Sequence, residues 1–142
     1  TAISSVNQNI QSSGNISIPI NFGNIIESKD VTIMNGNELM FSNDGLATGF
    51  LEFHLTKTGG GTETVNFWIQ YFDGANWIDI DNSGVEFNFN GQNEGSKSYT
   101  FQAVINSILK YRIVSYTEDP VTLENKNLIN NVFVPGSKVR IR

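Results

Sequence analysis

The chain contains no cysteine, a single histidine and only 3 prolines among its 142 residues. Without cysteine it cannot form a disulfide framework, a thiolate metal site or a cysteine nucleophile. One histidine is too few for a metal site built from several imidazoles. Apolar runs are short, at most three or four residues, so we expect no membrane insertion. These absences exclude disulfide-rich scaffolds and several classes of metalloprotein.

Positive charge is also scarce, with 9 basic against 14 acidic residues. Nucleic-acid-binding surfaces gather Lys and Arg, so we expect no nucleic-acid partner. Polarity comes instead from amides, since the chain holds 19 Asn and 5 Gln. Residues 1–5 show neither a basic nor an apolar segment, so we expect no signal peptide and synthesis in a reducing cytoplasm.

What the chain does contain is a regular alternation of apolar and polar residues, which predicts short β-strands. Such alternation occurs at residues 16–20, 31–33, 50–55, 65–72, 85–90, 99–105, 111–115 and 138–142. Turn dipeptides such as Asn35-Gly36 and Asp73-Gly74 separate these runs. Residues 102–110 and 120–128 alone could form helical turns.

We therefore predict an all-β fold, an antiparallel β-sandwich of about eight to ten short strands, with the jelly roll as its specific form. Residues 16–142 form the single predicted domain. Residues 1–15 are rich in Ser, Asn and Gln, and we interpret them as a polar N-terminal arm, extended or poorly ordered.

The predicted strand at residues 65–72 is aromatic on both faces. One face of a sandwich strand is normally polar and solvated, so Trp68 and Phe72 need a second cover. Phe50 and His54 repeat this pattern on the preceding strand. The cover can be a loop of the same chain, a neighbouring subunit or a ligand. The candidate subunit interface consists of Phe50, His54, Trp68 and Phe72.

Two stretches suggest a family. Residues 49–55 read Gly-Phe-Leu-Glu-Phe-His-Leu, and residues 65–84 contain an apolar strand with Trp68, a turn, and Asp79-Ile80-Asp81-Asn82-Ser83. They resemble the corresponding strands of the TNF/C1q-like jelly-roll modules of bacteriophage virion proteins. The resemblance implies a homotrimer with aromatic residues buried along its three-fold axis. It also implies a role in assembly or recognition rather than catalysis.

A metal site and a catalytic histidine are the two chemical alternatives. Residues 79–84 match the first six positions of a calcium loop, but position twelve is Asn90 instead of a bidentate Glu. We interpret this run as a strand that ends in a polar turn. His54 lies mid-strand, and the chain has no Gly-x-Ser-x-Gly elbow. We therefore predict no catalytic residue, no metal and no cofactor.

Carbohydrate binding is the main alternative function. Trp77 follows the turn at residues 73–74, and Asn76 and Asp79 lie beside it. An aromatic ring next to an amide and a carboxylate is typical of sugar sites, so Asn76, Trp77 and Asp79 are candidate glycan contacts. In the competing interpretation, Trp77 packs across its own hairpin.

The sequence thus favours a non-enzymatic structural protein of a bacteriophage virion, such as a capsid decoration, head-fibre or tail-associated subunit. We expect a homotrimer that contacts other virion proteins and, through its Asn-rich loops, host surface glycans. The alternative is a carbohydrate-binding or adhesin module that recognises cell-surface glycans.

Overall fold

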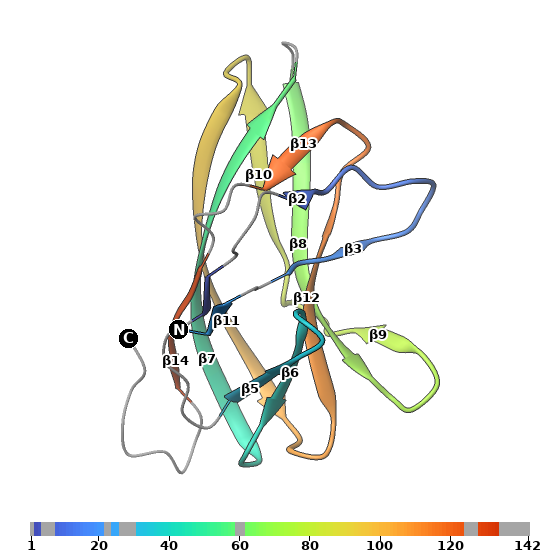
Figure 1. The fold of residues 1–142 in the computed structure, drawn as a ribbon, viewed down its shortest axis with the longest axis vertical. Helices are drawn as coiled ribbons and strands as arrows, with labels where there is room; N and C mark the ends of the chain where they lie inside the picture. Colours follow the sequence, from blue (N-terminus) through green and yellow to red (C-terminus); the bar gives the residue numbers. More distant parts are fainter. Residues whose placement is uncertain are drawn as a thin grey trace.

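The computed structural model of the chain describes residues 2–3, 8–21, 24–25, 31–58, 62–123 and 128–133. Across these residues the secondary structure consists of strands without a helix, and every strand pairing is antiparallel. Figure 1 looks along the two sheets edge-on, with β7 and β14 on the left and β8 and β12 on the right. The predicted all-β antiparallel sandwich is confirmed.

One layer, here called the β7 sheet, is built around its longest strand. It contains β1 (Ala2–Ile3), β2 (Gln8–Asn9), β4 (Asn24–Ile25), β7 (Gly45–Lys57), β11 (Glu94–Ile105), β13 (Val121–Leu123) and β14 (Leu128–Phe133). The order is β2-β13-β7-β14-β1-β4, and β11 pairs with β7 as well. β11 runs beside β7 for its whole length, from Glu94 opposite Thr56 to Ile105 opposite Gly45.

The other layer, the β8 sheet, has β8 and β12 at its centre. It contains β3 (Ile18–Pro19), β5 (Val31–Met34), β6 (Glu38–Phe41), β8 (Thr62–Phe72), β9 (Trp77–Asp79), β10 (Val85–Asn90) and β12 (Lys110–Tyr116). The order is β10-β8-β12-β6-β5, with β3 on β12 and β9 on β8. β9 and β10 pair with different stretches of β8, at residues 70–72 and 62–67 respectively.

The core lies between the two sheets and is rich in phenylalanine. Phe53 of β7 and Phe67 of β8 stack face to face, with ring centroids 4.2 Å apart and planes 5° apart. Phe87 and Phe89 of β10 meet edge to face at 4.8 Å. Each fully buried ring contributes about 2–3 kcal/mol of transfer free energy. The alternation in the sequence therefore predicted these inward-facing residues correctly.

Two glycines are required by the local geometry. Asn35 and Gly36 have φ angles of 54° and 78°, which gives the β5–β6 hairpin the left-handed turn typical of an Asn-Gly pair. At Gly95 an added Cβ would overlap the ring of Phe87. The absence of a side chain at Gly95 thus lets β11 approach β10 at the end of the sandwich.

The structure corrects two predictions about chain organisation. Residues 102–105 complete β11 and residues 121–123 form β13, so these parts of the two stretches that could have formed helical turns are strands. Pairing with β7 and the β-branched residues favour strands at both places. The sandwich also begins before residue 16, because β2 pairs with β13 and Ile10 is fully buried in the core. The predicted strand at residues 138–142 lies outside the described residues.

Candidate functional site

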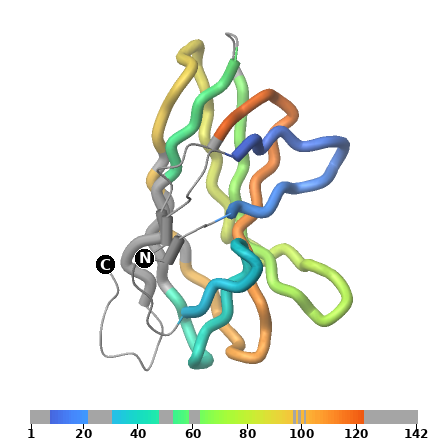
Figure 2. Tube along the Cα trace, in the orientation of Figure 1, coloured from blue at the N-terminus to red at the C-terminus, as the bar shows by residue number. Residues whose placement is uncertain are grey.

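The outward side of the β8 sheet carries a cluster of aromatic and polar side chains. Phe67 and Ile69 of β8 face the core, so Trp68, Gln70 and Phe72 point to the opposite side. β9 pairs with this end of β8 through the turn at residues 73–76. Figure 2 shows the β8–β9 hairpin projecting from the sandwich, apart from the β2–β3 loop.

A chain of hydrogen bonds links β8, β9 and β12 across this surface. The indole Nε1 of Trp68 donates to Oδ1 of Asp79 at 2.6 Å, and Nε2 of Gln70 donates to the same oxygen at 2.9 Å. Nε of Arg112 donates to Oε1 of Gln70 at 2.8 Å. The carboxylate of Asp79 is therefore held by two donors, which fixes its position on the sheet.

Two side chains of the same chain pack against the ring of Trp77. The Arg112 guanidinium lies 4.1 Å from the centre of this ring, and Phe72 packs against it at 5.2 Å. Partial burial lowers the pKa of Arg112, and the negative charge of Glu38 opposes that shift. Lys110 forms an ion pair with Glu38 at 3.5 Å. We call Trp68, Gln70, Phe72, Trp77, Asp79 and Arg112 the aromatic-polar cluster.

The structure brings together residues that the sequence assigned to two separate functions. Trp68 and Phe72 were candidate interface residues, whereas Trp77 and Asp79 were candidate glycan contacts. All four lie in the aromatic-polar cluster, and Asn76 is exposed in the adjoining turn. β9 thus supplies part of the cover that Trp68 and Phe72 require, which favours the same-chain alternative for these two side chains.

The other two candidate interface residues lie on the opposite sheet. His54 is half-buried on β7, where its Nδ1 lies 2.8 Å from Oγ of Ser96 on β11. Phe50 is also in β7, but its side chain lies outside the described residues. Trp68 and Phe72 belong to β8, so the four predicted residues are divided between the two layers. His54 and Trp68 do not share one continuous face.

The turn that resembles a calcium loop is held by a buried serine. Oγ of Ser83 accepts the backbone N–H of Ile69 at 3.0 Å and donates to the carbonyl of Ile80 at 2.7 Å. Asn82 adopts a φ of 60°, and the carboxylate of Asp79 is already engaged by Trp68 and Gln70. No group of three or more His, Cys, Asp or Glu side chains that could hold a metal ion occurs among the described residues.

A second feature of the same sheet is an open hollow beside Trp68. It has a volume of about 530 Å³. We call it the Trp68 hollow, and its lining comprises Asn66, Phe67, Trp68, Gly84, Val85, Glu86 and Tyr116. Strands β8, β10 and β12 all contribute to it, and Gly84 comes from the loop that precedes β10.

The edge of the sandwich between β9 and β11 carries exposed apolar residues. Val104 and Ile108 are each 79% exposed, Leu46 is 45% exposed and Ile78 is 36% exposed. Leu46 and Val104 are direct partners across β7 and β11. With Ile78 they line a hollow of about 860 Å³, and Ile108 precedes Leu109 at its rim. We call Leu46, Ile78, Val104 and Ile108 the open side.

Sequence reasoning missed the open side because it followed the aromatic residues. A signal was nevertheless present. In Ala103-Val104-Ile105 three consecutive residues are apolar, although alternate residues of a strand point to opposite faces. Ala103 and Ile105 are buried, so Val104 must point outward. The pair Leu46-Ala47 breaks the alternation in the same way on the partner strand.

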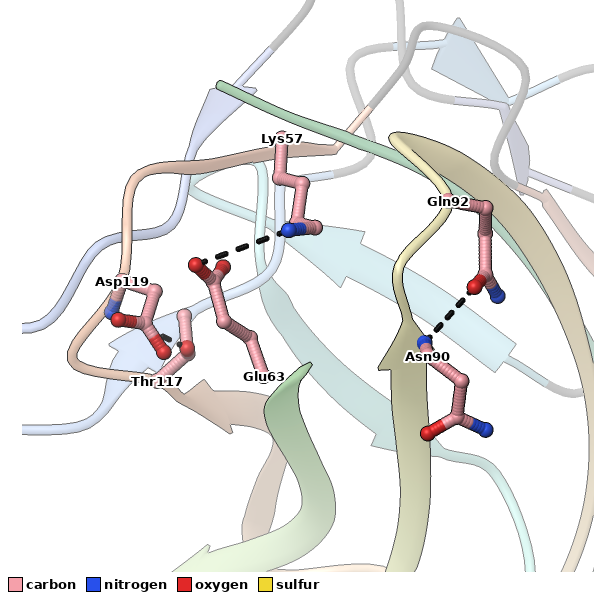
Figure 3. Close-up of polar contacts among 6 residues, drawn as sticks. All are labelled: Lys57, Glu63, Asn90, Gln92, Thr117 and Asp119. Carbon is pink, nitrogen blue, oxygen red and sulfur yellow. Dashed lines mark hydrogen bonds and ion pairs between the residues drawn. The ribbon is translucent and has the colours of Figure 1, made fainter. Parts of the chain in front are cut away.

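Figure 3 shows a buried ion pair at one end of the sandwich, where Lys57 of β7 points toward Glu63 of β8. Nζ of Lys57 lies 3.8 Å from Oε1 of Glu63, and the lysine side chain is fully buried. The lysine also lies 5.6 Å from the centre of the Phe89 ring. Nearby, the backbone N–H of Asp119 donates to Thr117. This ion pair holds the end of β7 against the start of β8. We therefore assign it a structural role.

No protein-family model matches the sequence, and no curated protein is similar to it. The part of the chain that the structure describes has no helix long and apolar enough to cross a membrane. The open side, the aromatic-polar cluster and the Trp68 hollow are therefore the features from which function is inferred.

Proposed function

We propose that the protein is a non-enzymatic structural subunit that assembles with copies of itself through the open side. The proposed setting is a bacteriophage virion, as a capsid decoration, head-fibre or tail-associated subunit. The proposed assembly is a homotrimer in contact with other virion proteins. This setting is supported by the sequence resemblance of residues 49–55 and 65–84 to jelly-roll modules of such proteins.

The exposure of large apolar side chains on the open side is the observation that carries the proposal. Val104 and Leu46 face solvent side by side on paired strands, and Ile78 approaches from the other sheet across the hollow. Gathered apolar residues of this kind mark interaction surfaces on proteins. Their burial against a second copy would remove apolar area from water, which is the main driving force of association.

The edge of β11 adds a second reason for assembly. β11 is twelve residues long and, among the described strands, pairs only with β7. A long strand with one unpaired edge tends to pair with another chain unless charge or a covering segment protects it. At Val104, near the end of β11, the side chain is apolar and 79% exposed. Partner contact at this end would cover both the edge and the open side.

The strand order supports the jelly roll as the specific form of the sandwich. Along the chain, β7 lies in one sheet, β8 and β10 in the other, β11 in the first, β12 in the second and β14 in the first. The resulting neighbours are β11-β7-β14-β1 and β10-β8-β12-β6. Two four-stranded sheets that exchange strands in this manner are typical of paired Greek keys.

Light scattering after size exclusion tests the proposal. A homotrimer has three times the 15.7 kDa mass of the chain, and its closed ring requires the open side to meet a different surface of the next copy. The double variant Leu46→Glu/Val104→Glu places charge on the open side, and we expect it to be monomeric and folded. Ile16→Glu is the matched control, because Ile16 is 68% exposed in the separate β2–β3 loop.

The expected result is a trimer for the wild type and for Ile16→Glu. A wild-type chain that stays monomeric at every concentration would overturn the proposed assembly. A double variant that keeps the wild-type mass would show that the open side is not the interface. A mass of two chains would replace the trimer with a two-fold contact.

A further inference from the structure

We infer that the Trp68 hollow is a binding site for a neutral saccharide. This inference rests on the β8 sheet alone and does not depend on assembly through the open side. It also moves the candidate glycan site away from Trp77, where the sequence placed it. The ring of Trp77 has Arg112 4.1 Å from its centre and Phe72 against it. That ring is thus poorly placed to stack on a ligand.

The strand register builds the hollow from two neighbouring rows of residues. In the first row, Tyr116 of β12 pairs with Asn66 of β8, and Asn66 pairs with Glu86 of β10. In the second row, Val114 pairs with Trp68. Gly84 lies on the other flank of Trp68, where a Cβ added to the glycine would come within 3.9 Å of the tryptophan Cβ. Glycine has no side chain to fill that flank, so the indole borders open space.

The Trp68 ring is suited to act as a platform because its orientation is fixed. Its Nε1 donates to Asp79 at 2.6 Å, and Asp79 is held in turn by Gln70. A pyranose ring has an apolar face of C–H groups that can pack on an aromatic ring and leave water. Ligand sites typically combine such an apolar wall with a few polar groups that set orientation. A platform that is already ordered loses little entropy on binding.

The polar groups of the hollow match the hydroxyl groups of a sugar. The side-chain amide of Asn66 makes no hydrogen bond to another described residue, so its carbonyl and its NH₂ group are both available. Glu86 accepts a hydrogen bond from Asn88 at 3.1 Å through Oε1, which orients the carboxylate and leaves Oε2. A sugar hydroxyl both donates and accepts, so an amide beside a carboxylate can bind two adjacent hydroxyls.

The charges around the hollow favour a neutral ligand over an anionic one. Glu86 lines the hollow, and Glu118 accepts a hydrogen bond from Tyr116 at its rim. Among the described residues that line it, none is basic. The basic residues of β12, Arg112 and Lys110, do not line the hollow and contact Gln70 and Glu38 instead. An acidic saccharide would meet like charge without a compensating partner, which opposes binding.

The first experiment separates the two tryptophans. Trp77→Phe leaves Trp68 as the sole indole, and Trp68→Phe leaves Trp77. The probes are an array of neutral hexose and N-acetylhexosamine oligosaccharides, their sialylated counterparts and a trimethylammonium salt. The strongest binder is then used in a fluorescence titration of each variant. We expect a neutral saccharide to bind and to change the emission of the Trp77→Phe protein. We expect a much smaller change in the Trp68→Phe protein.

The second experiment fills the hollow without removing a contact. A Cβ at Gly84 would lie 3.5 Å from the carbonyl oxygen of Phe67, which is an ordinary contact, so Gly84→Val should fold and project into the hollow. We expect Gly84→Val, Trp68→Ala and Asn66→Ala each to weaken saccharide binding about tenfold or more. Thermal melting and oligomeric mass, measured on every variant, separate lost binding from lost folding or assembly.

Three results would overturn the inference. One is that the wild type binds no neutral saccharide on the array. Another is that Gly84→Val, folded and of wild-type mass, binds as tightly as the wild type. The third is a response to the sialylated glycans or to trimethylammonium in place of the neutral ones. None of these results bears on the mass of the assembly, so the proposed function is judged separately.

Discussion

The two sides of β9 face surfaces of opposite character. On one side, Trp77 and Asp79 are bound by Arg112, Trp68 and Gln70 in the aromatic-polar cluster. On the other side, Ile78 lines the open side and is 36% exposed. The first surface has partners within the chain for its aromatic and polar groups. The second leaves large apolar groups in solvent.

This difference shows that an aromatic face is not by itself an unsatisfied face. Trp68 and Trp77 are conspicuous in the sequence, but within one chain Trp68 is hydrogen-bonded to Asp79 and the ring of Trp77 contacts Arg112 and Phe72. Val104 and Leu46 are ordinary aliphatic residues, but the structure leaves them exposed on paired strands. Assembly is thus expected at the aliphatic surface, and specific ligand binding at the aromatic one.

The largest expected effect comes from releasing β9, which alters both surfaces together. Ser83→Ala removes the acceptor for the Ile69 N–H and the donor to the Ile80 carbonyl in a buried position. We expect the free energy of unfolding to fall by about 2–3 kcal/mol, since buried backbone groups lose their partner. Urea denaturation measures this change. The exposed Ser98→Ala on β11 should change stability by less than about 0.5 kcal/mol, and equal losses would contradict the role of Ser83.

A smaller effect is expected from a change confined to the aromatic side. Arg112→Met keeps the aliphatic stem but removes the hydrogen bond to Gln70 and the cation over Trp77. We expect a loss of about 2 kcal/mol in unfolding free energy and a change in tryptophan emission. Arg112→Lys should restore little, because an ammonium group cannot bond Gln70 and stack on Trp77 at once. Full recovery with lysine would show that charge alone matters.

Much of the fold was predictable from local pattern. The alternation at residues 85–90 coincides with β10, and the runs at residues 65–72 and 111–115 fall within β8 and β12. The Asn35-Gly36 dipeptide marks the β5–β6 turn, where both residues have positive φ. These features depend on side-chain period and backbone preference, which are local properties. The buried Ile10 was missed because it is one apolar residue between polar neighbours, which gives no alternating pattern.

The sites were less predictable because they depend on which strands become neighbours. The sequence placed Trp68 and Phe72 with Phe50 and His54, but β7 and β8 belong to different sheets. The Trp68 hollow requires Gly84 and Tyr116 beside β8, and this register arises from long-range pairing. The sequence proposed Trp68 as an interface residue and Asp79 as a glycan contact, yet it could not show that Asp79 orients Trp68.

Low pH should destabilise two exposed turns, one next to the open side and one next to the aromatic-polar cluster. Hydrogen bonds from Ser107 lower the pKa of Asp44 below its usual 3.8, and the N–H groups of Asn76 and Ala75 lower that of Asp73. A lowered folded-state pKa means that the ionised carboxylate stabilises the fold. The contribution is complete above the unfolded value and is lost as pH falls through the lowered folded value.

The measurement is thermal melting between pH 7 and about pH 2. We expect Asp44→Asn to reduce the acid-induced loss of melting temperature at the turn that holds Ile108, and Asp73→Asn to do so at the β8–β9 turn. Both residues are exposed, so each effect should be small. If neither variant flattens the acid limb of the pH profile, these turns do not contribute to acid sensitivity.

The smallest effect on subunit stability is expected on the open side itself. Val104→Thr keeps the β-branched shape at a position that is 79% exposed, so the unfolding free energy at low protein concentration should change by less than about 0.5 kcal/mol. Its effect should appear instead in the concentration dependence of the melting temperature. A second copy that binds only the folded state stabilises that state, so the melting temperature rises with protein concentration. We expect the melting temperature to rise clearly with concentration for the wild type and less for Val104→Thr. Arg112→Met, by contrast, should lower the melting temperature at every concentration, but the temperature should rise with concentration as steeply as in the wild type. If the melting temperature of the wild type does not depend on concentration, the open side stays in contact with water and is not an interface. The open side and the aromatic side would then differ only in what they contribute to the stability of the fold.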